Sequence, residues 1–444
     1  MRIATDTALD EGVWLRPFRT LIYAMPPYIC DDEEIRRITQ AMVRAAAAEA
    51  PVTDASSPLA WLGEVERQRE VAGLRRRLRT RSAAEPEIDL ASNDYLGLSR
   101  HPQVIEAGVE ALRIWGAGST GSRLVTGNTE LHEELERELA TFMGAQSALV
   151  FSSGYTANLG AVVALSGPGT LIVSDARTHA SLIDACRLSR ARVVVTPYRD
   201  TQAVAAALAQ RPEERALVLT DAVFSADGAL APLTELYAVC RDHSAVLLVD
   251  EAHGLGVRGP GGRGLAVRAH LIDAARPFIF DTGLAPAAAG SALAALRLLA
   301  VEPERVRAVL DHAAALGQWC GVAEKPESAV VPVILGDPTV AFNAAKACLE
   351  QGVRVGCFRP PSVPEGQSLL RLTARASLTE ADLDRVREVL AGVLALARHQ
   401  GIDVTVCKPV QTGDDRDADE VARLSGVRRV QTLVRYPEPL APVA

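Results

Sequence analysis

The segment VLLVDEAHGLG, residues 246 to 256, decides the fold that this sequence predicts. Its apolar start predicts a buried strand that ends at Asp250, and the following turn presents His253. A carboxylate at the carboxyl end of a parallel strand points into the crevice where such sheets bind ligands. Asp250 could keep the ring nitrogen of a pyridine cofactor protonated, and His253 could hydrogen-bond its ring hydroxyl. An ordinary Asp that caps the following turn would give the same pattern.

The surrounding sequence alternates strand-like runs with helical stretches up to about residue 260, which predicts a mainly parallel α/β sheet covered on both faces. These runs are residues 148–151, 170–173, 192–195, 216–219 and 246–249. After about residue 290, helices and short strands predict a smaller α+β domain. Its expected strands are residues 330–335, 353–357 and 368–373, and a helix over residues 380–398 closes it.

Polar residues follow several of these strands. FSSGYTANLG, residues 151 to 160, predicts a helix start whose backbone N–H groups could hold a phosphate, while Tyr155 could stack on an aromatic ring. His179 and Ser225 each come just after a predicted strand. One such residue is usually structural, but polar residues at four successive strand ends favour a binding site.

Other function classes are disfavoured. The net charge is −8, with no broad basic field, so we expect neither nucleic acid nor a membrane surface as a partner. Gly254, Gly256 and Gly259 match G-x-G-x-x-G, but Pro260 follows where a dinucleotide site needs a helix. No signal peptide is recognisable, which predicts a cytoplasmic protein. Seven single cysteines lack metal-ligand spacing, so we expect reduced, mostly buried thiols and no metal site.

The order and spacing of several motifs resemble the α-oxoamine synthases, and among them the 8-amino-7-oxononanoate synthases. The resemblance covers about residues 53 to 398 and implies a fold-type I pyridoxal-phosphate enzyme that forms a homodimer. The motifs are SNDYLGL (92–98), GAGSTGSRLVTGNTELHEELE (116–136), SSGYTAN (152–158), HASLIDA (179–185), VFSADG (223–228), DEAHGLGVRGPGGRG (250–264) and RPPSVPEGQSLLRLT (359–373).

The resemblance implies cofactor contacts position by position. Gly154 and Tyr155 match the pair beside the phosphate of pyridoxal 5′-phosphate. His179 matches a histidine that stacks on the pyridine ring. Ser225, Asp250 and His253 match the residues that hold the ring hydroxyl and the ring nitrogen. His179, Asp250 and His253 are therefore the candidate catalytic residues.

The resemblance also implies substrate contacts and a reaction. Arg75, in LRRR, matches an arginine that contacts the substrate, while Arg371 and Thr373 match a pair near the substrate carboxylate. The family's reaction condenses L-alanine with a pimeloyl thioester and releases carbon dioxide, a step of biotin biosynthesis. A lysine that binds the cofactor covalently also moves the α-proton.

That lysine is missing from this sequence. Lysine occurs only at positions 325, 346 and 408, none within a matching motif. After Gly264 the chain passes almost at once to residues 267–280, which in the family lie beyond two further strands. A deletion near residue 265 of roughly 20 to 30 residues would remove two strands and their turns. We therefore expect a shortened sheet and an inactive chain; the alternatives are a non-catalytic cofactor-binding or scaffold protein, or an α-oxoamine synthase with another acyl thioester.

The flanks resemble other biotin enzymes. Residues 12–30 are similar to the C-terminal tail of diaminopelargonate aminotransferase, with Arg16 at its substrate-carboxylate position. Residues 401–413 are similar to dethiobiotin synthetase after its phosphate-binding loop, with Lys408 and Thr412 at matching positions. We expect six parts along the chain: an aminotransferase-like fragment, a linker, an N-terminal arm containing an Arg-rich helix over residues 59–85, a large domain, a small domain and a synthetase-like fragment. In that order, the parts are residues 1–47, 48–58, 59–90, 91–290, 291–398 and 399–444.

Overall fold

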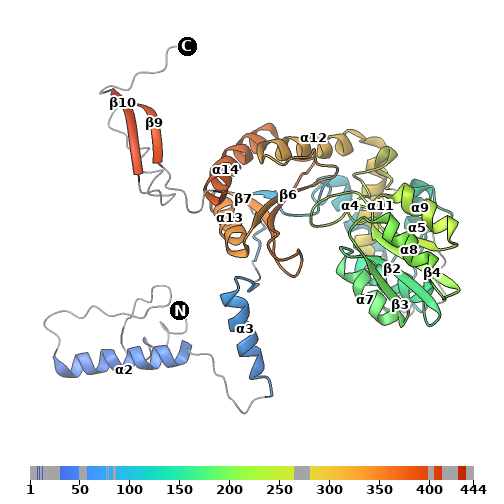
Figure 1. The fold of residues 1–444 in the computed structure, drawn as a ribbon, viewed down its shortest axis with the longest axis horizontal. Helices are drawn as coiled ribbons and strands as arrows, with labels where there is room; N and C mark the ends of the chain where they lie inside the picture. Colours follow the sequence, from blue (N-terminus) through green and yellow to red (C-terminus); the bar gives the residue numbers. More distant parts are fainter. Residues whose placement is uncertain are drawn as a thin grey trace. The chain divides into compact units, whose positions relative to one another are not determined.

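A computed structural model gives the structure of the chain (Figure 1). It describes residues 8, 10, 13, 31–49, 58–76, 78, 80–83, 87–264 and 281–398, and the backbone of residues 405–412 and 429–436. The chain divides into two compact units, Met1–Arg79 and Thr80–Ala444. Among the helices so described, none is long and apolar enough to cross a membrane.

The first unit contains helices α2, Asp32–Glu49, and α3, Trp61–Val71. The carboxylate of Asp31 caps α2 by accepting hydrogen bonds from the backbone N–H groups of Glu33 and Glu34. The expectation of a helix over residues 59–85 is wrong about its end. Gly73 adopts a left-handed φ of 66°, and the Leu74 N–H bonds back to the Arg69 carbonyl, which together terminate α3.

The second unit contains the predicted parallel sheet, with strand order β3-β2-β4-β5. The strands are β2 (Thr170–Asp175), β3 (Arg192–Thr196), β4 (Arg215–Asp221) and β5 (Val246–Asp250), connected through α7 (Ala180–Ser189), α8 (Thr201–Ala209) and α9 (Leu233–Asp242). Leu171 and Val218 belong to one buried cluster, Ile172 and Leu217 to another. Because neighbouring strand residues point to opposite faces, both faces of the sheet are covered, as predicted.

Four more helices belong to this part of the chain: α4 (Pro102–Trp115), α5 (Glu130–Met143), α6 (Gly154–Leu165) and α11 (Pro286–Val301). α4 and α11 pack closely through small residues. A Cβ added at Gly108 would lie 2.5 Å from the Ser291 hydroxyl, and one at Gly290 would lie 2.8 Å from the Ala107 carbonyl oxygen. Glycine at both positions therefore allows the two helix backbones to approach each other.

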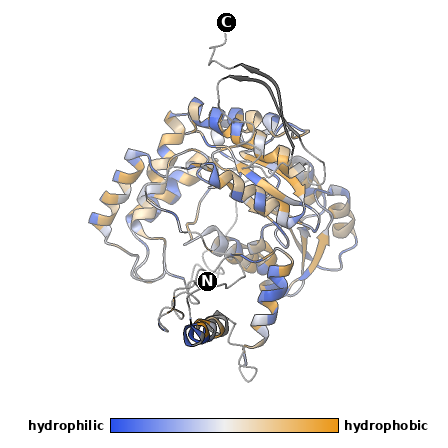
Figure 2. Cartoon of the chain, turned by 90° about the vertical axis from the view of Figure 1, so that its left-hand side faces the viewer, coloured by the Kyte–Doolittle hydropathy of each residue, from blue (hydrophilic) through white to orange (hydrophobic). Residues whose placement is uncertain are grey.

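The predicted small α+β region forms a second sheet of order β1-β7-β8-β6. Its elements are β1 (Ile88–Leu90), β6 (Val330–Gly336), β7 (Val353–Phe358), β8 (Ser368–Thr373), α12 (Glu304–Trp319), α13 (Pro338–Glu350) and α14 (Glu380–Arg398). β1 precedes the large sheet in sequence but pairs in parallel with β7, while β8 is antiparallel to β6 and β7. In Figure 2 several strands in the coloured part of the chain are orange, the colour of hydrophobic residues.

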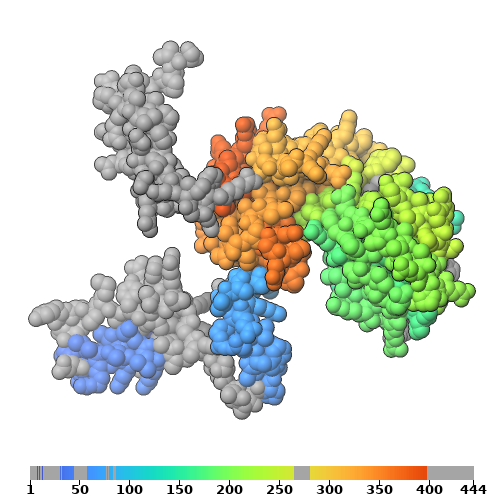
Figure 3. Space-filling view, in the orientation of Figure 1, coloured from blue at the N-terminus to red at the C-terminus, as the bar shows by residue number. Residues whose placement is uncertain are grey.

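The two sheets' regions meet near the loop after β4. The Ser328 hydroxyl donates to the Gly228 carbonyl over 2.9 Å, and the Arg371 guanidinium donates to the Ser225 carbonyl over 3.0 Å. In Figure 3 the green atoms of the large-sheet region adjoin the orange atoms of the small-sheet region. A loop of the large sheet is thereby held against β8, the strand that carries Arg371.

The flanks are described only in part. Strands β9, Thr405–Thr412, and β10, Arg429–Tyr436, pair in parallel. β9 includes Lys408 and Thr412, but their side chains lie outside the described part of the chain. Arg16 also lies outside it. The similarity of the flanks to two other biotin enzymes stays a prediction.

The large sheet differs from expectation at one edge, because residues 148–151 do not form a strand. The backbone N–H of Val150 donates to Glu136 over 2.7 Å, and its carbonyl accepts from Arg123 over 3.0 Å. Side chains thus satisfy backbone groups that a neighbouring strand would otherwise bind. Within the described residues β5 pairs only with β4. β5 is exposed or half-buried throughout, although β4 is almost wholly buried.

Replacing Glu136 with Ala should destabilise the chain strongly. The carboxylate pairs at 2.8 Å with Arg123, whose side chain is only 4% exposed, so its loss leaves a buried charge without its main partner. We expect the free energy of unfolding in urea to fall by about 3–5 kcal/mol. Glu134→Ala is the matched control, because it removes another α5 glutamate that pairs with an exposed arginine, Arg297. Similar unfolding midpoints for E136A and E134A would contradict the role assigned to the buried pair.

Candidate functional site

Two carboxylates lie side by side where β4 and β5 end. Asp221 and Asp250 are register partners in the parallel pair. Asp221 is 2% exposed, and its Oδ1 accepts a hydrogen bond of 3.2 Å from the backbone N–H of His179. Burial, and secondarily the charge of Asp250, raises the pKa of Asp221 to about 8. Asp221 is therefore mainly protonated at neutral pH and leaves Asp250 without a second negative charge beside it.

Asp250 is held by two donors. Its Oδ1 accepts from the Ala252 backbone N–H over 2.8 Å, and its Oδ2 accepts from the Asn158 side-chain amide over 2.7 Å. Asn158 lies on α6, four residues after Gly154, so both face the same side of the helix. The same amide donates to the Ser181 hydroxyl over 2.8 Å. Asn158 thus links the start of α6, the end of β5 and the start of α7.

His179 is the N-cap of α7, and its side chain is exposed. Its Nδ1 lies 2.7 Å from the Ser181 hydroxyl and also accepts from the Ser181 backbone N–H. Because Ser181 already accepts from Asn158, its hydroxyl hydrogen is available to donate to Nδ1. A neutral His179 then carries its ring proton on Nε2. The network fixes the orientation of a ring whose face is open to a ligand.

The start of α6 is open to solvent at the two residues expected beside a phosphate. A Cβ built on Gly154 meets no atom within 4 Å, and Tyr155 is 43% exposed. Ser153 caps the helix by accepting from the Thr156 N–H over 3.2 Å. The Tyr155 hydroxyl donates to Asp184 over 2.6 Å, and this bond raises the pKa of Tyr155. Tyr155 is therefore bound to a side chain of α7.

His253 and Arg371 approach each other where the two sheets' regions meet. Burial, and then the charge of Arg371, lowers the pKa of His253 to about 4, so His253 is neutral near pH 7. The Arg371 guanidinium is 6% exposed and lies 4.7 Å from the centre of the Phe358 ring. It also binds Asn93 Oδ1 at 2.8 Å. The structure thus brings Ser225, His253 and Arg371 into one network, Ser225 through its backbone carbonyl.

The remaining two sequence-predicted residues have different surroundings. Thr373 is fully buried, on the same face of β8 as Arg371, and its hydroxyl has no hydrogen-bond partner among the described residues. Arg75 belongs to the first unit, where it pairs with Glu66 and Glu70 of α3. The proposed contact of Arg75 with a substrate stays a prediction.

The donor set fits a phosphorylated pyridine in its non-covalent contacts. Exposed backbone N–H groups at the start of α6 suit a phosphate, and a carboxylate anchored by Asn158 suits a protonated ring nitrogen. The set does not supply an amine for covalent attachment. Lys325 is exposed in a loop, and Lys346 is exposed on α13, where it pairs with Glu350 at 3.4 Å. The side chain of Lys408 is outside the described part of the chain.

Two residues of the site, Asn158 and Asp221, were not among the predicted site residues. Asn158 ends the motif SSGYTAN, and its place one helical turn after Gly154 was a usable signal. Asp221 ends the strand ALVLTD just as Asp250 ends VLLVD, so two strand-end carboxylates could have been expected together. Nothing in the sequence pattern indicated that one of them is the more deeply buried.

Replacing Asp221 with Asn should remove a pH dependence of stability. From its ordinary pKa of 3.8 up to about 8, the folded chain holds a proton at Asp221 that the unfolded chain has lost. Raising the pH through this window therefore lowers the free energy of unfolding, by about 1.4 kcal/mol per pH unit for this one proton. The free energy of unfolding, measured with denaturant between pH 6.5 and 8, should fall with pH less steeply in D221N than in the original chain, by that amount. Parallel slopes for the two proteins would exclude a proton on Asp221.

Comparisons with known sequences identify the family. A profile of the aminotransferase class I and II family matches residues 85–266 and 264–390. The 8-amino-7-oxononanoate synthase of Mycobacterium sp. (strain KMS) is 67% identical over 375 residues, covering 77% of this chain and 98% of the relative. That of Mycobacterium tuberculosis (strain F11) is 64% identical over 386 residues, covering 80% of this chain and 99% of the relative.

Solved structures share the fold. A lysine-to-alanine variant of serine palmitoyltransferase from S. paucimobilis, bound to PLP and myriocin, is 30% identical with a TM-score of 0.72, over 77% of this chain and 99% of that one. The 8-amino-7-oxononanoate synthase of Francisella tularensis has a TM-score of 0.60 at 24% identity, over 71% and 99%, and supports the fold alone. The chain therefore belongs to the 8-amino-7-oxononanoate synthase family of pyridoxal-phosphate-dependent, fold-type I transferases.

Proposed function

We propose that this chain derives from an enzyme that condenses L-alanine with a pimeloyl thioester in biotin biosynthesis, and that it holds pyridoxal phosphate without turning over. The observation that carries the proposal is the anchored Asp250 in a sequence without a lysine at the site. Bound pyridoxal phosphate supplies an electron sink for negative charge at an amino acid's α-carbon. This chain's residues would bind and orient it, but none of the residues that the structure describes at the site can serve as both covalent partner and proton carrier.

The alignment supports an internal deletion. The alignment with the strain KMS relative is 375 positions long, but it covers only 77% of this chain. For a chain of 444 residues, that share is about 342 residues. About 33 positions of the alignment thus have no counterpart here, since 375 exceeds 342 by that number. The two matches of the family profile also adjoin at residues 264 to 266. This is the junction at which the sequence motifs lose the lysine segment.

The sheet edge supports the same deletion independently. Val246 is 48% exposed, and the apolar residues Leu247, Leu248 and Val249 after it are only half-buried. A strand that is apolar on both faces normally lies inside a parallel sheet. The backbone of Val150, in the run expected to form a further strand, binds side chains instead. Both features follow if the strands between β5 and residues 148–151 are lost.

Cofactor binding without the lysine is supported by the site's own contacts. Asp250 and Asn158 would hold the ring nitrogen, the start of α6 the phosphate, and His179 the ring face. Arg371, charged and nearly buried, would bind the substrate carboxylate. The serine palmitoyltransferase variant with a lysine replaced by alanine carries PLP and myriocin, a precedent within the same fold. We further propose a cytoplasmic homodimer.

Covalent trapping tests the proposal. Borohydride reduces the bond between a lysine and the cofactor, which makes the attachment permanent. When this chain is treated with borohydride in the presence of pyridoxal phosphate, its mass should therefore stay that of the protein alone. The chain should form product from L-alanine and pimeloyl thioester at least about 10²- to 10⁴-fold more slowly than the Mycobacterium relative, because both the covalent partner and the proton carrier are absent. Measurable turnover with another acyl thioester would favour the alternative α-oxoamine synthase.

A rescued chain provides the matched control. Inserting the relative's missing segment at residues 264 to 266 should restore trapping by borohydride and product formation together. If the chain with the insertion binds the cofactor but gains no activity, a scaffold role for this chain is favoured. A lysine adduct in the original chain would overturn the proposal.

A further inference from the structure

The loop SNDYLGL, residues 92–98, lies beside the site, and the proposed function gives it no role. It places Tyr95, which is 5% exposed, against His253. The Tyr95 hydroxyl hydrogen-bonds His253 Nδ1, and it lies 3.3 Å from Asn93 Oδ1. Asn93 Oδ1 in turn accepts from Arg371 over 2.8 Å. The loop therefore touches both His253 and the arginine expected to bind the substrate carboxylate.

The direction of the Tyr95–His253 bond follows from the neighbouring groups. The Tyr95 hydroxyl has one hydrogen, which can go to His253 Nδ1 or to Asn93 Oδ1. Asn93 Oδ1 already accepts a hydrogen bond from the charged Arg371 guanidinium. The nitrogen of a neutral imidazole is also a stronger base than the oxygen of an amide or of a neutral phenol. The hydrogen therefore goes to Nδ1, and a neutral imidazole must then carry its own proton on Nε2.

We propose that Tyr95 is a positioning residue for His253, whose tautomer it fixes by donating to Nδ1 so that Nε2–H is the donor that faces a ligand. The proposal rests on the proposed role of His253 toward the cofactor, but it concerns the protein alone. Burial raises the pKa of Tyr95 to about 12, so its hydroxyl keeps its hydrogen throughout the neutral range. The charged and titratable groups around His253 are Arg371, Asp250 and His179.

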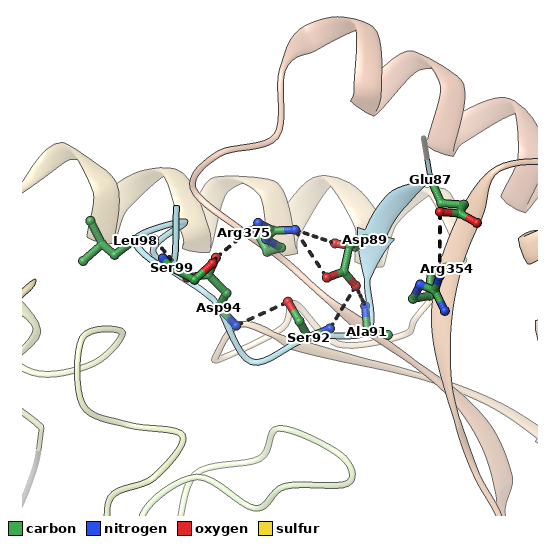
Figure 4. A network of polar contacts seen from close by, with 9 residues as sticks. All are labelled: Glu87, Asp89, Ala91, Ser92, Asp94, Leu98, Ser99, Arg354 and Arg375. Carbon is green, nitrogen blue, oxygen red and sulfur yellow. Dashed lines mark hydrogen bonds and ion pairs between the residues drawn. The ribbon is translucent and has the colours of Figure 1, made fainter. Parts of the chain in front are cut away.

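The loop is anchored on both sides of Tyr95. Figure 4 shows Arg375 between Asp89 and Asp94, with Nη2 at 3.3 Å from the Asp94 carboxylate and Nη1 at 3.5 Å from that of Asp89. The other oxygen of Asp94 accepts from the backbone N–H of Leu98 over 2.9 Å. These contacts close the loop into a compact turn.

The backbone of Tyr95 is itself tied to the residue after Arg375. The Tyr95 carbonyl accepts from the Ala376 N–H over 2.7 Å. Gly97 adopts a left-handed φ of 66°, and a Cβ there would lie 2.6 Å from the Ser377 Cβ. The segment 375–377, which follows β8, therefore packs against the loop 92–98, while the Tyr95 side chain contacts His253. Arg375 acts through this loop, and we assign it the role of holding Tyr95 in place.

Nitrogen NMR of the cofactor-free protein tests the proposal. In protein labelled with ¹⁵N at histidine, with the His253 signals assigned by their loss in His253→Gln, Nε2 should carry the proton and Nδ1 should not. Tyr95→Phe keeps the ring but loses the donor, so His253 should populate both tautomers. Its pKa should rise by about one unit, because a hydrogen bond to the neutral form is removed.

Two further variants sharpen the result. Tyr237→Phe is the matched control, since Tyr237 is 61% exposed on α9, and it should leave the His253 signals unchanged. Arg375→Gln should shift the tautomers in the same direction as Y95F; unchanged signals would overturn the anchoring role of Arg375. A proton on Nδ1 in the original chain, or identical His253 signals in Y95F, would overturn the proposal. None of these results depends on whether the cofactor binds or turns over.

Discussion

The hydrogen bond from Asn158 to Asp250 is the contact on which the arrangement of the site depends. It joins the helix whose start suits a phosphate to the strand whose end suits a ring nitrogen, and the same amide extends the connection to Ser181 and His179. The neighbouring Asp221 is mainly protonated near neutral pH, since burial raises its pKa. A protonated Asp221 therefore places no second negative charge beside Asp250. The protonation of Asp221 and the hydrogen bond from Asn158 thus both favour Asp250 as the partner of the ring nitrogen.

The junction at residues 264 to 266 bears both on the extent of the large sheet and on the catalytic lysine. Under the proposed function, the segment lost near residue 265 would have continued the sheet beyond β5 and would have supplied the lysine. What remains is a half-buried apolar strand and a Val150 backbone bound by Glu136 and Arg123. The non-covalent contacts survive because they come from α6, β4, β5 and β8, all encoded outside the junction. On this proposal, the chain would retain a binding site for the cofactor without the group that makes the site catalytic.

Periodicity predicted β2 to β8 because each is a short apolar run between polar turns, and it predicted α14 from residue 380 to residue 398. It failed at residues 148–151, where the local sequence favours a strand but pairing depends on a distant partner. It also failed after Val71, where Gly73 ends α3 although arginines and leucines continue beyond it. The site residues at strand ends were predictable from their position. The hydrogen-bond partners of Asn158 and Tyr95 were not, because they lie 92 and 158 residues away in sequence.

The central claim is that the contacts centred on Asp250 hold pyridoxal phosphate without a covalent bond to the protein. An equilibrium titration of pyridoxal phosphate into the purified chain, compared with Asp250→Asn, tests it most directly. We expect saturable binding that dialysis fully reverses and that D250N weakens by about 10- to 100-fold, because the substitution removes a carboxylate that would hydrogen-bond the cofactor. Absence of binding, or equal affinity in the two proteins, would contradict it.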